Sequence, residues 1–260
     1  MRNCPQCNTE LPEGFQFCGN CGHKLSEEEQ QPQNPQPQTM YFGGLQTPSK
    51  ARLTLIKGDS GDGVTYHLTG EEHYAGRDEG EILFPEDYFL SPQHAAFYYQ
   101  DDKLWVRDEG SANGVFVRIR APMPLRPSAR FLVGEQLIQF EPASEQEFAH
   151  QPTDDGTYFY SSPRRPCQFK LVQVLRGGDI GMIYRAPTEE VIMGRDGNDI
   201  NFPDDPYISG RHAKVYAMGS ECFLSDLGSK NGTFLMLTEP YELSHGDYVF
   251  LGQQLLRDEL

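Results

Sequence analysis

The side chains best suited to bind a ligand lie in one stretch of the sequence, at positions 194–234. A Gly-Arg pair ends at Arg195, Ser209 and His212 stand at S-x-x-H spacing, and an Asn-Gly pair begins at Asn231. A guanidinium, a hydroxyl and a carboxamide all donate hydrogen bonds. The imidazole has no partnered nucleophile in the sequence, so the pattern indicates binding and not catalysis.

A second group of residues is suited to metal binding. Cys4 and Cys7 form one C-x-x-C pair, and Cys18 and Cys21 form another after ten intervening residues. Each pair lies on a tight turn that directs both sulfurs to one point, as tetrahedral zinc requires. We expect one structural zinc ion, because a segment of about 25 residues cannot build its own core. Residues 1–25 resemble a short zinc ribbon.

A disulfide pair is the alternative use of these cysteines. The N-terminus argues against it, because it has no apolar signal-peptide core and so does not indicate an oxidising compartment. His23 follows the last cysteine, and four thiolates already complete the zinc shell, so we expect it to be a bystander.

The ligand-binding pattern occurs twice. A shift of 118 residues aligns Gly76-Arg77 with Gly194-Arg195, Ser91 with Ser209, His94 with His212, and Asn113-Gly114 with Asn231-Gly232. We expect this register to slip by six residues after Val117, since a Pro-rich loop at 121–127 precedes Gly134-Glu135, which then aligns with Gly246-Asp247.

The elements that carry these residues are predicted to be strands. Short runs bounded by turn residues occur at 52–57, 64–69, 95–100, 103–108, 114–119, 137–141, 190–194 and 248–251. Such runs favour an all-β fold with two sandwiches of roughly 90 residues each. Loops at the strand ends would then hold the donors.

The motifs of the second copy resemble those of the forkhead-associated (FHA) domain, a small β-sandwich that reads phosphothreonine. The resemblance implies two FHA-like sandwiches in tandem, preceded by the zinc ribbon. It also implies that Arg195 and Ser209 bind the phosphate, while Asn231 holds the main chain of the peptide. Arg211 and Lys230 are expected to add positive charge beside the phosphate.

The resemblance implies a supporting role for the other motif residues. Gly194 lets the backbone come close, and His212 braces the binding loops by hydrogen bonding. The full set of expected supporting residues is Gly76, His94, Gly114, Gly194, His212 and Gly232.

The first copy keeps three of the expected ligand contacts, which are Arg77, Ser91 and Asn113. It departs from the pattern elsewhere, because Pro92 and Gln93 replace Gly210 and Arg211, and Ala112 replaces Lys230. Proline has no backbone N–H to donate. Since one charge-assisted hydrogen bond is worth roughly 1.5 to 3 kcal/mol, we expect the first site to bind phosphate more weakly.

The sequence divides into five segments. They are a zinc ribbon at 1–25, a disordered Gln/Pro/Glu-rich linker at 26–50, FHA-like domain 1 at 51–141, an interdomain linker at 142–166, and FHA-like domain 2 at 167–260. Thr39 and Thr47 lie in the first linker and are candidates for an intramolecular phosphothreonine.

Charge, hydropathy and the absence of catalytic motifs argue against several classes of function. The net charge is −16, and residues 51–141 hold 9 basic and 15 acidic side chains, so a nucleic-acid surface is not expected. No apolar run reaches the roughly 18 residues of a membrane span, and we expect a cytoplasmic protein. The sequence has no nucleotide-binding loop and no nucleophile elbow, so we expect no enzyme.

Three functions remain at this point. The first is a non-enzymatic adaptor that binds threonine-phosphorylated proteins downstream of a Ser/Thr kinase. The second is a phosphate-independent scaffold, which the departures in the first copy favour for that domain. The third is a nucleic-acid or transcription-associated factor acting through the zinc ribbon, although residues 1–25 carry only two basic side chains against two acidic ones.

Overall fold

A computed structural model describes residues 2–3, 6–11, 21, 51–56, 63–144, 152–160, 162–163 and 165–259. All regular secondary structure within these ranges is β-strand, which confirms the predicted all-β class. The described part contains no helix long and apolar enough to cross a membrane. The chain divides into two compact units, Met1–Gln46 and Thr47–Leu260, and each is described by itself.

The described part of the first unit contains one short hairpin. Strand β1 (Arg2–Asn3) pairs antiparallel with β2 (Glu10–Leu11), and Cys7 lies on the turn between them. Cys21 is exposed. Cys4, Cys18 and the linker with Thr39 and Thr47 lie outside the described residues.

The second unit contains both repeats. The first repeat supplies β3 (Ala51–Leu55), β4 (Thr65–Leu68), β5 (Glu72–Gly76), β6 (Ile82–Leu83), β7 (Ala95–Gln100), β8 (Lys103–Asp108), β9 (Val115–Arg118), β10 (Met123–Leu125), β11 (Arg130–Val133) and β12 (Gln136–Pro142). The second repeat supplies β13 (Phe169–Val174), β14 (Ile180–Arg185), β15 (Glu190–Gly194), β16 (Ile200–Asn201), β17 (Ala213–Met218), β18 (Glu221–Asp226), β19 (Thr233–Met236), β20 (Tyr241–Glu242), β21 (Tyr248–Leu251) and β22 (Gln254–Glu259). The predicted runs at 95–100, 103–108 and 190–194 are confirmed residue for residue.

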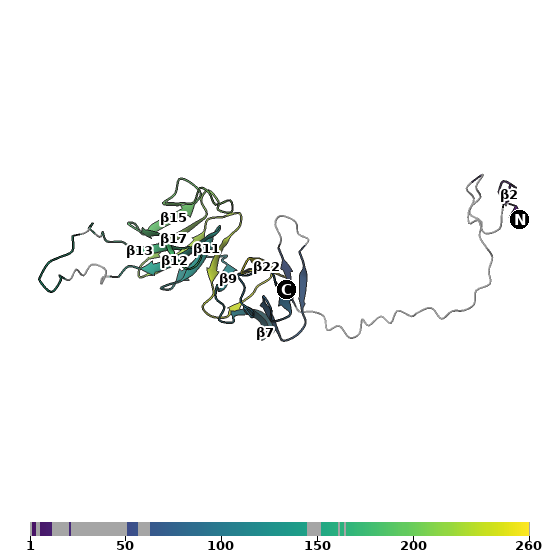
Figure 1. Cartoon of the computed structure of the whole chain (residues 1–260), viewed down its shortest axis with the longest axis horizontal. Coiled ribbons are helices and arrows are strands. Elements are labelled where there is room, and N and C mark those ends of the chain that lie inside the picture. The colour runs from purple at the N-terminus through teal and green to yellow at the C-terminus, as the bar shows by residue number, and fades with distance from the viewer. Residues whose placement is uncertain are drawn as a thin grey trace. The chain divides into compact units, whose positions relative to one another are not determined.

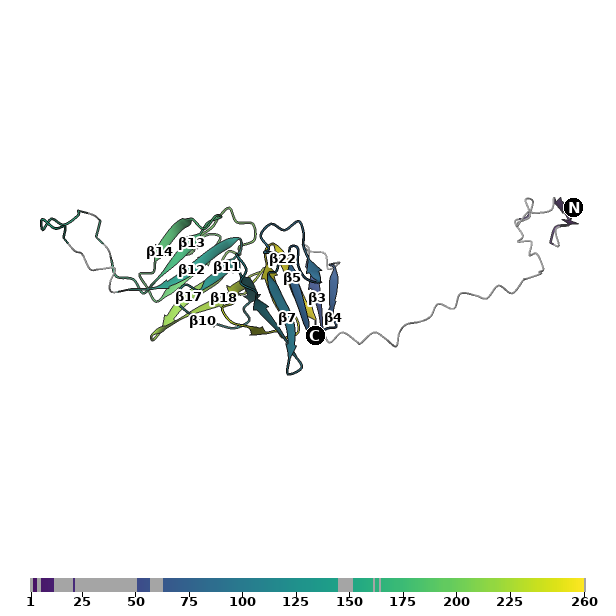
Figure 2. The ribbon, with the colours of Figure 1, turned by 60° about the horizontal axis from the view of Figure 1, so that its bottom comes forward.

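One long sheet passes through both sandwiches. Its strand order is β14-β13-β12-β11-β19-β9-β21-β22-β3-β4, with β9 and β19 paired at the middle (Figure 1). Two five-stranded sheets, β10-β18-β17-β15-β16 and β20-β8-β7-β5-β6, complete the two sandwiches (Figure 2).

The two repeats exchange their last strands. Strands β10, β11 and β12 of the first repeat pair with β18, β19 and β13 of the second. Strands β20, β21 and β22 of the second repeat pair in return with β8, β9 and β3 of the first. We call residues 123–142 and 241–259 the exchanged segments. The ranges 51–141 and 167–260 therefore describe sequence repeats, and each sandwich is assembled from strands of both.

The hydrophobic cores require this exchange. One core combines Leu53 and Phe97 of the first repeat with Val249, Leu251 and Leu256 of the second. The other core combines the first repeat's aromatic side chains Phe131 and Phe140 with second-repeat residues such as Phe169, Val191 and Leu224. Burial of one such side chain stabilises the fold by roughly 1.5 to 3 kcal/mol, so each exchanged segment is held by several large apolar contacts.

The expected six-residue slip in the repeat register is wrong. The turn of β11–β12 is closed by Val133 and Gln136, and the turn of β21–β22 is closed by Leu251 and Gln254. Gly134 therefore corresponds to Gly252, which keeps the shift of 118 residues. The Pro-rich loop of the first repeat has a counterpart of equal length in the second, so the register has no reason to change.

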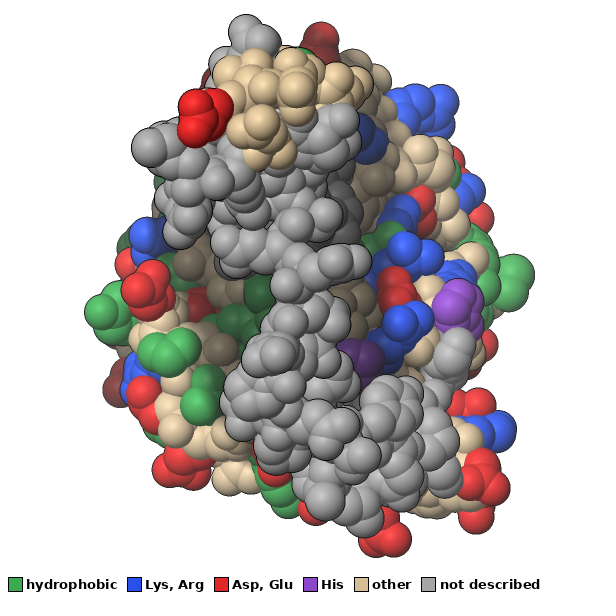
Figure 3. All heavy atoms as spheres, turned by 90° about the vertical axis from the view of Figure 1, so that its right-hand side faces the viewer, with side chains coloured by type: hydrophobic (Ala, Val, Ile, Leu, Met, Phe, Trp, Pro, Cys, Tyr) green, Lys and Arg blue, Asp and Glu red, His purple; other side chains and the backbone are tan. Residues whose placement is uncertain are grey.

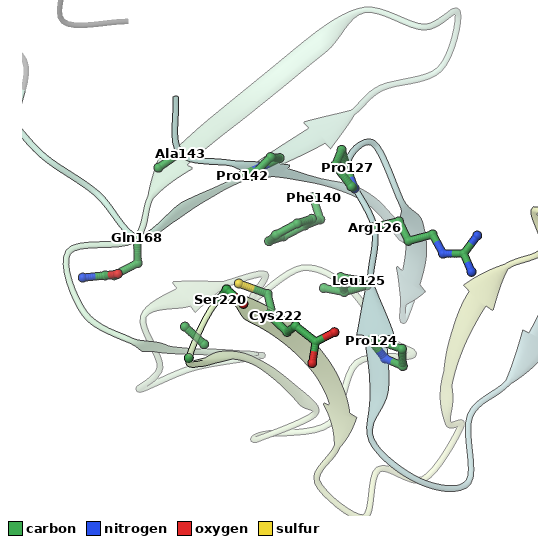
Figure 4. Close-up of a pocket in the computed structure, with 13 residues that line it drawn as sticks. Pro124, Leu125, Arg126, Pro127, Phe140, Pro142, Ala143, Gln168, Ser220 and Cys222 are labelled. Carbon is green, nitrogen blue, oxygen red and sulfur yellow. The ribbon is translucent and has the colours of Figure 1, made fainter. Parts of the chain in front are cut away.

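The pairing of β10 with β18 provides a covalent test of the exchange. Leu125 lies opposite Cys222, and both residues line the same hollow between the repeats (Figure 4). Facing residues of antiparallel strands have Cα atoms about 4.5 to 5.5 Å apart, which suits a disulfide. We predict that Leu125→Cys forms an intramolecular disulfide with the native Cys222 on mild oxidation, seen as a linked peptide by mass spectrometry of the monomer.

The double variant Leu125→Cys, Cys222→Ser is the control and should give no such peptide. If the repeats folded without exchange, β10 would lie beside β8 instead of β18. A monomer that stays unlinked would therefore contradict the exchange.

A buried carboxylate marks the first sandwich. Asp258 on β22 is fully buried, and neither of its carboxylate oxygens has a hydrogen-bond partner in the described part of the chain. The corresponding position of the first repeat, at the shift of 118 residues, is the buried Phe140. Burial, together with the negative charge of Asp247, raises the pKa of Asp258 to about 7.

This carboxylate gives the fold a pH dependence. A carboxyl group whose pKa is raised by folding contributes stability that is fully present below its unfolded-state pKa, near 4. For Asp258 this contribution is lost as the pH rises through about 7. We predict that the free energy of unfolding falls less between pH 5 and pH 8 in Asp258→Asn than in the parent protein. Over this window the difference is roughly 3 kcal/mol at most, because the proton is lost over the two pH units between 5 and about 7. Urea unfolding at several pH values measures it, and identical pH slopes in both proteins would contradict the assignment.

Candidate functional site

Three loops of the second repeat meet at one end of its sandwich. Arg195 directly follows β15, Ser209 lies between β16 and β17, and Asn231 lies between β18 and β19. The backbone N–H of Arg195 donates to the carbonyl oxygen of Ser209 at 3.0 Å. A Cβ added at Gly194 would lie 2.1 Å from the carbonyl oxygen of Gly210, so only glycine allows this approach. The three predicted ligand contacts are therefore brought together.

His212 connects two of these loops. Its Nδ1 accepts from the backbone N–H of Ser209 at 3.0 Å, and its Nε2 lies 3.0 Å from the carbonyl oxygen of Gly232. Because Nδ1 accepts, the ring proton sits on Nε2 and is donated to Gly232. The ring is fully buried, and burial lowers its pKa, so the imidazole is neutral. These contacts are the bracing expected from the sequence.

The loops leave unused hydrogen-bonding groups facing solvent. Ser209 Oγ accepts from the backbone N–H of Lys230 at 3.1 Å, so its own proton can be donated to a ligand. Asn231 Nδ2 donates to the carbonyl oxygen of Tyr207 at 2.7 Å, which fixes the carboxamide. The other amide hydrogen and the side-chain oxygen of Asn231 remain available for a peptide main chain.

Positive charge gathers beside these donors. Arg195 is exposed, and its Nη2 donates to the carbonyl oxygen of Ile208 at 2.7 Å. It forms no ion pair with a carboxylate in the described ranges. Arg211 and Lys230 are also exposed at the same loops. The arrangement thus offers an anion one guanidinium held on the carbonyl oxygen of Ile208, the residue before Ser209, with two further exposed cations on the loops that carry Ser209 and Asn231.

The loop that carries Asn231 is shaped by residues that we did not include in the site. Asp226 Oδ2 accepts from the hydroxyls of Ser229 at 2.6 Å and of Thr233 at 2.7 Å. Burial acts to raise the pKa of Asp226, but the hydrogen bonds from Ser229 and Thr233 outweigh it, and the pKa is lowered. The signal was in the sequence, because Asp and Ser keep the same spacing before both Asn-Gly pairs.

The first repeat builds the same bracing at its own loops. Ser91 N–H donates to His94 Nδ1 at 3.1 Å, and His94 Nε2 lies 3.1 Å from the carbonyl oxygen of Gly114. Asn113 Nδ2 donates to the carbonyl oxygen of Phe89 at 2.8 Å. As in the second repeat, burial lowers the pKa of His94.

The first site differs in its arginine. Arg77 Nε forms an ion pair with Asp78 Oδ2 at 2.9 Å, whereas Arg195 contacts only backbone carbonyls among the described residues. An anion at the first site would have to compete with this carboxylate. The first site also lacks the cations Arg211 and Lys230, as the sequence indicated.

One loop of each candidate site is anchored on the opposite repeat. Asp205 Oδ2 accepts from the backbone N–H of Glu135 at 2.8 Å and from Gln136 Nε2 at 2.9 Å, and both donors belong to the first exchanged segment. Asp205 Oδ1 accepts from the backbone N–H of Tyr207 at 2.9 Å, which fixes the loop before Ser209. Both Asp205 and its first-repeat counterpart are buried, and sequence reasoning missed them.

That counterpart, Asp87, makes the reciprocal contacts. Its Oδ2 accepts from the backbone N–H of Gln253 at 2.7 Å and from Gln254 Nε2 at 2.8 Å. Its Oδ1 accepts from the backbone N–H of Phe89 at 3.0 Å. The loops of both candidate sites therefore depend on the exchange of strands.

The zinc-ribbon segment can be tested against the cysteines that the structure describes. Cys7 lies on the hairpin turn between β1 and β2, where a C-x-x-C pair needs its second thiol. Its Sγ lies 3.3 Å from the hydroxyl of Thr9. The described residues contain no group of three metal ligands, since Cys4 and Cys18 fall outside them. The four-thiol donor set and the turn fit zinc.

Comparison with known families identifies the same three segments. The model of the FHA domain matches residues 73–134 and again residues 191–252. The model of the zinc-ribbon domain matches residues 3–25. The two FHA matches differ by the shift of 118 residues, as the alignment of the repeats requires.

The curated relatives each align with a stretch of this chain about as long as one domain. The FHA domain-containing protein FhaB of Mycobacterium tuberculosis (strain H37Rv) is 36% identical over 80 residues, covering 31% of this chain and 51% of that protein. The oxoglutarate dehydrogenase inhibitor of Corynebacterium jeikeium (strain K411) is 34% identical over 86 residues, covering 32% of this chain and 59% of that protein. The chain thus spans little more than half the length of these relatives.

Solved FHA structures also align with single domains. The FHA domain of the CT664 protein from Chlamydia trachomatis is 30% identical, with a TM-score of 0.22, covering 35% of this chain and 96% of that structure. A structure from a study of phosphothreonine-dependent FHA domain interactions is 28% identical, with a TM-score of 0.20, covering 31% of this chain and 85% of that structure. The family matches, the repeated motifs and the sandwiches agree: this chain contains two FHA domains in tandem, preceded by a zinc-ribbon segment.

Proposed function

We propose that this protein is a non-enzymatic adaptor that binds threonine-phosphorylated proteins in Ser/Thr kinase signalling, mainly through its second site. The observation that carries the proposal is the exposed guanidinium of Arg195 beside Ser209, whose hydroxyl proton is unused in the described structure. A phosphoryl group carries nearly two negative charges and three acceptor oxygens, which match a guanidinium and a hydroxyl. Asn231 would hold the main chain of the bound peptide.

Charge distribution supports a local anion site. The chain has a net charge of −16, and acidic and basic side chains are interspersed over the described surface in Figure 3. Against this background Arg195, Arg211 and Lys230 form a small basic group at the loop ends. An extended basic stripe would instead favour nucleic acid, and we do not propose that alternative.

The first site supports a different role. Arg77 is already paired with Asp78, and Ala112 replaces the lysine of the second site. We propose that the first domain acts mainly as a phosphate-independent scaffold that completes the second. A partner with two phosphothreonines would still gain avidity if the first site retains weak affinity.

The N-terminal segment is proposed to hold one structural zinc ion through Cys4, Cys7, Cys18 and Cys21. Zinc would supply folding energy to this segment and no catalytic position, because four protein thiolates close the coordination shell. Thr39 and Thr47 remain proposed sites of an intramolecular phosphothreonine, and a cytoplasmic location remains our proposal.

The proposal is tested by fluorescence anisotropy with matched phosphothreonine, phosphoserine and unphosphorylated peptides. We predict that Arg195→Ala weakens phosphothreonine binding by ten-fold or more, because one charge-assisted hydrogen bond contributes roughly 1.5 to 3 kcal/mol. The affinity of Arg195→Lys for the phosphothreonine peptide should lie between those of the parent and of Arg195→Ala, because lysine keeps the charge and loses the bidentate fork.

Arg126→Ala is the matched control. Arg126 is an exposed arginine that pairs with Glu239 at the surface, away from the three loops of the second site, so its removal should leave the affinity unchanged. Circular dichroism should show that the exposed-site variants keep the fold. Equal affinity of the parent protein for all three peptides would refute phosphothreonine reading.

A further inference from the structure

Each Asn-Gly loop is covered by a side chain from the opposite repeat. Strands β9 and β19 pair with Arg118 opposite Phe234 and Met236 opposite Phe116. This places Arg118 of the first repeat against the second site's Gly232, where an added Cβ would lie 2.2 Å from Arg118 Nε. Met236 of the second repeat lies against Gly114 of the first site in the same way, with its sulfur 2.7 Å from an added Cβ.

These two covering residues occupy one position of the repeat. Arg118 and Met236 are separated by the same 118 residues as the Asn-Gly pairs. The local geometry is therefore alike at the two sites, and the chemistry differs. The second site is covered by a guanidinium and the first by a thioether.

The charge of Arg118 is not neutralised locally. The side chain is half-buried, with its guanidinium carbon 5.4 Å from the centre of the Tyr248 ring. No carboxylate in the described part of the chain forms an ion pair with it, although the chain as a whole is strongly acidic. Its positive charge acts on His212, where it adds to the lowering of the pKa by burial. Arg118 is thus electrostatically part of the second site.

We propose that Arg118 is a specificity-determining residue of the second site, contributed by the first repeat, and that it favours an acidic side chain next to the phosphothreonine. This inference rests on the proposed phosphothreonine binding. The guanidinium lies against Gly232, which directly follows Asn231 in the loop. Asn231 would hold the main chain of a peptide, so flanking side chains would pass close to Arg118. A half-buried cation without a carboxylate partner attracts a carboxylate more strongly than a solvated one does.

The first site should select differently. Met236 offers an adaptable apolar surface where the second site offers a cation. With Gln93 and Ala112 in place of Arg211 and Lys230, the first site keeps only Arg77 of the basic group. An acidic flank should therefore gain nothing at the first site, and one chain would carry two sites of different preference.

The test measures a ratio of affinities on the full chain. A phosphothreonine peptide with a single Glu, placed in turn at each of the three positions on either side, is compared with the same peptide carrying Gln. Arg77→Ala is the background, so that the second site dominates the signal. We expect at least one Glu position to bind about ten-fold more tightly than Gln, and Arg118→Met to reduce this ratio to about one.

Two further variants separate binding from structure. Arg257 lies over the same Tyr248 ring, at 6.0 Å, but the atoms nearest to an added Cβ at Gly232 all belong to Arg118. Arg257→Met should therefore keep the Glu-to-Gln ratio. Met236→Arg, in the same Arg77→Ala background, should also keep the ratio, because Met236 lies against Gly114 of the first site. A purely structural role of Arg118 would lower the melting temperature and leave the ratio unchanged.

The outcomes distinguish this inference from the proposed function. A parent protein that discriminates phosphothreonine from threonine, with a ratio unaffected by Arg118→Met, would overturn only the role of Arg118. A parent protein without that discrimination would overturn the proposed function and this inference together.

Discussion

The pairing of β9 with β19 is the contact on which the arrangement of the two domains depends. Three residue pairs join these short strands and make the two halves of the long sheet continuous. Each strand is followed by a segment that enters the opposite sandwich, so the chain crosses between the repeats twice. Because the exchanged segments carry large buried side chains such as Phe131 and Leu251, neither core is complete without both repeats.

The loops of the candidate sites also depend on contacts between the two repeats. Asp205 fixes the loop before Ser209 by accepting from Glu135 and Gln136, which belong to the other repeat. Buried carboxylates are costly unless hydrogen bonds satisfy them, so these contacts also hold the exchanged segment in place. A change in one exchanged segment would therefore reach the binding site built mainly from the other repeat.

The two sites share a frame and differ in charge. The neutral histidines His94 and His212 make the same two contacts in their own repeats. The second site surrounds this frame with cations that form no ion pair among the described residues, while the first pairs Arg77 with Asp78. Since a rigid scaffold removes the entropic cost of ordering the loops, the difference in charge should decide which site attracts an anion more strongly.

The sequence alone determined the number of repeats, the strand class and the motif residues. The shift of 118 residues located Arg195, Ser209 and Asn231 as loop residues, and alternating short runs placed strands such as β7 and β8. These features are local, because a strand pattern or a turn depends on neighbouring residues. The aspartate and serine that shape the Asn-Gly loops were readable too, since their spacing repeats.

Only the tertiary structure decided which sandwich each terminal segment completes. The segments ending at Pro142 and Glu259 have the same register and the same Gly-x-Gln turn. Judged from the sequence, either turn could therefore donate its hydrogen bonds to Asp87 or to Asp205. Their partners are set by long-range strand pairing and by the path of the chain beyond β9 and β19. For the same reason Arg118 could not be assigned to the second site, because its neighbour Gly232 is more than a hundred residues away along the chain.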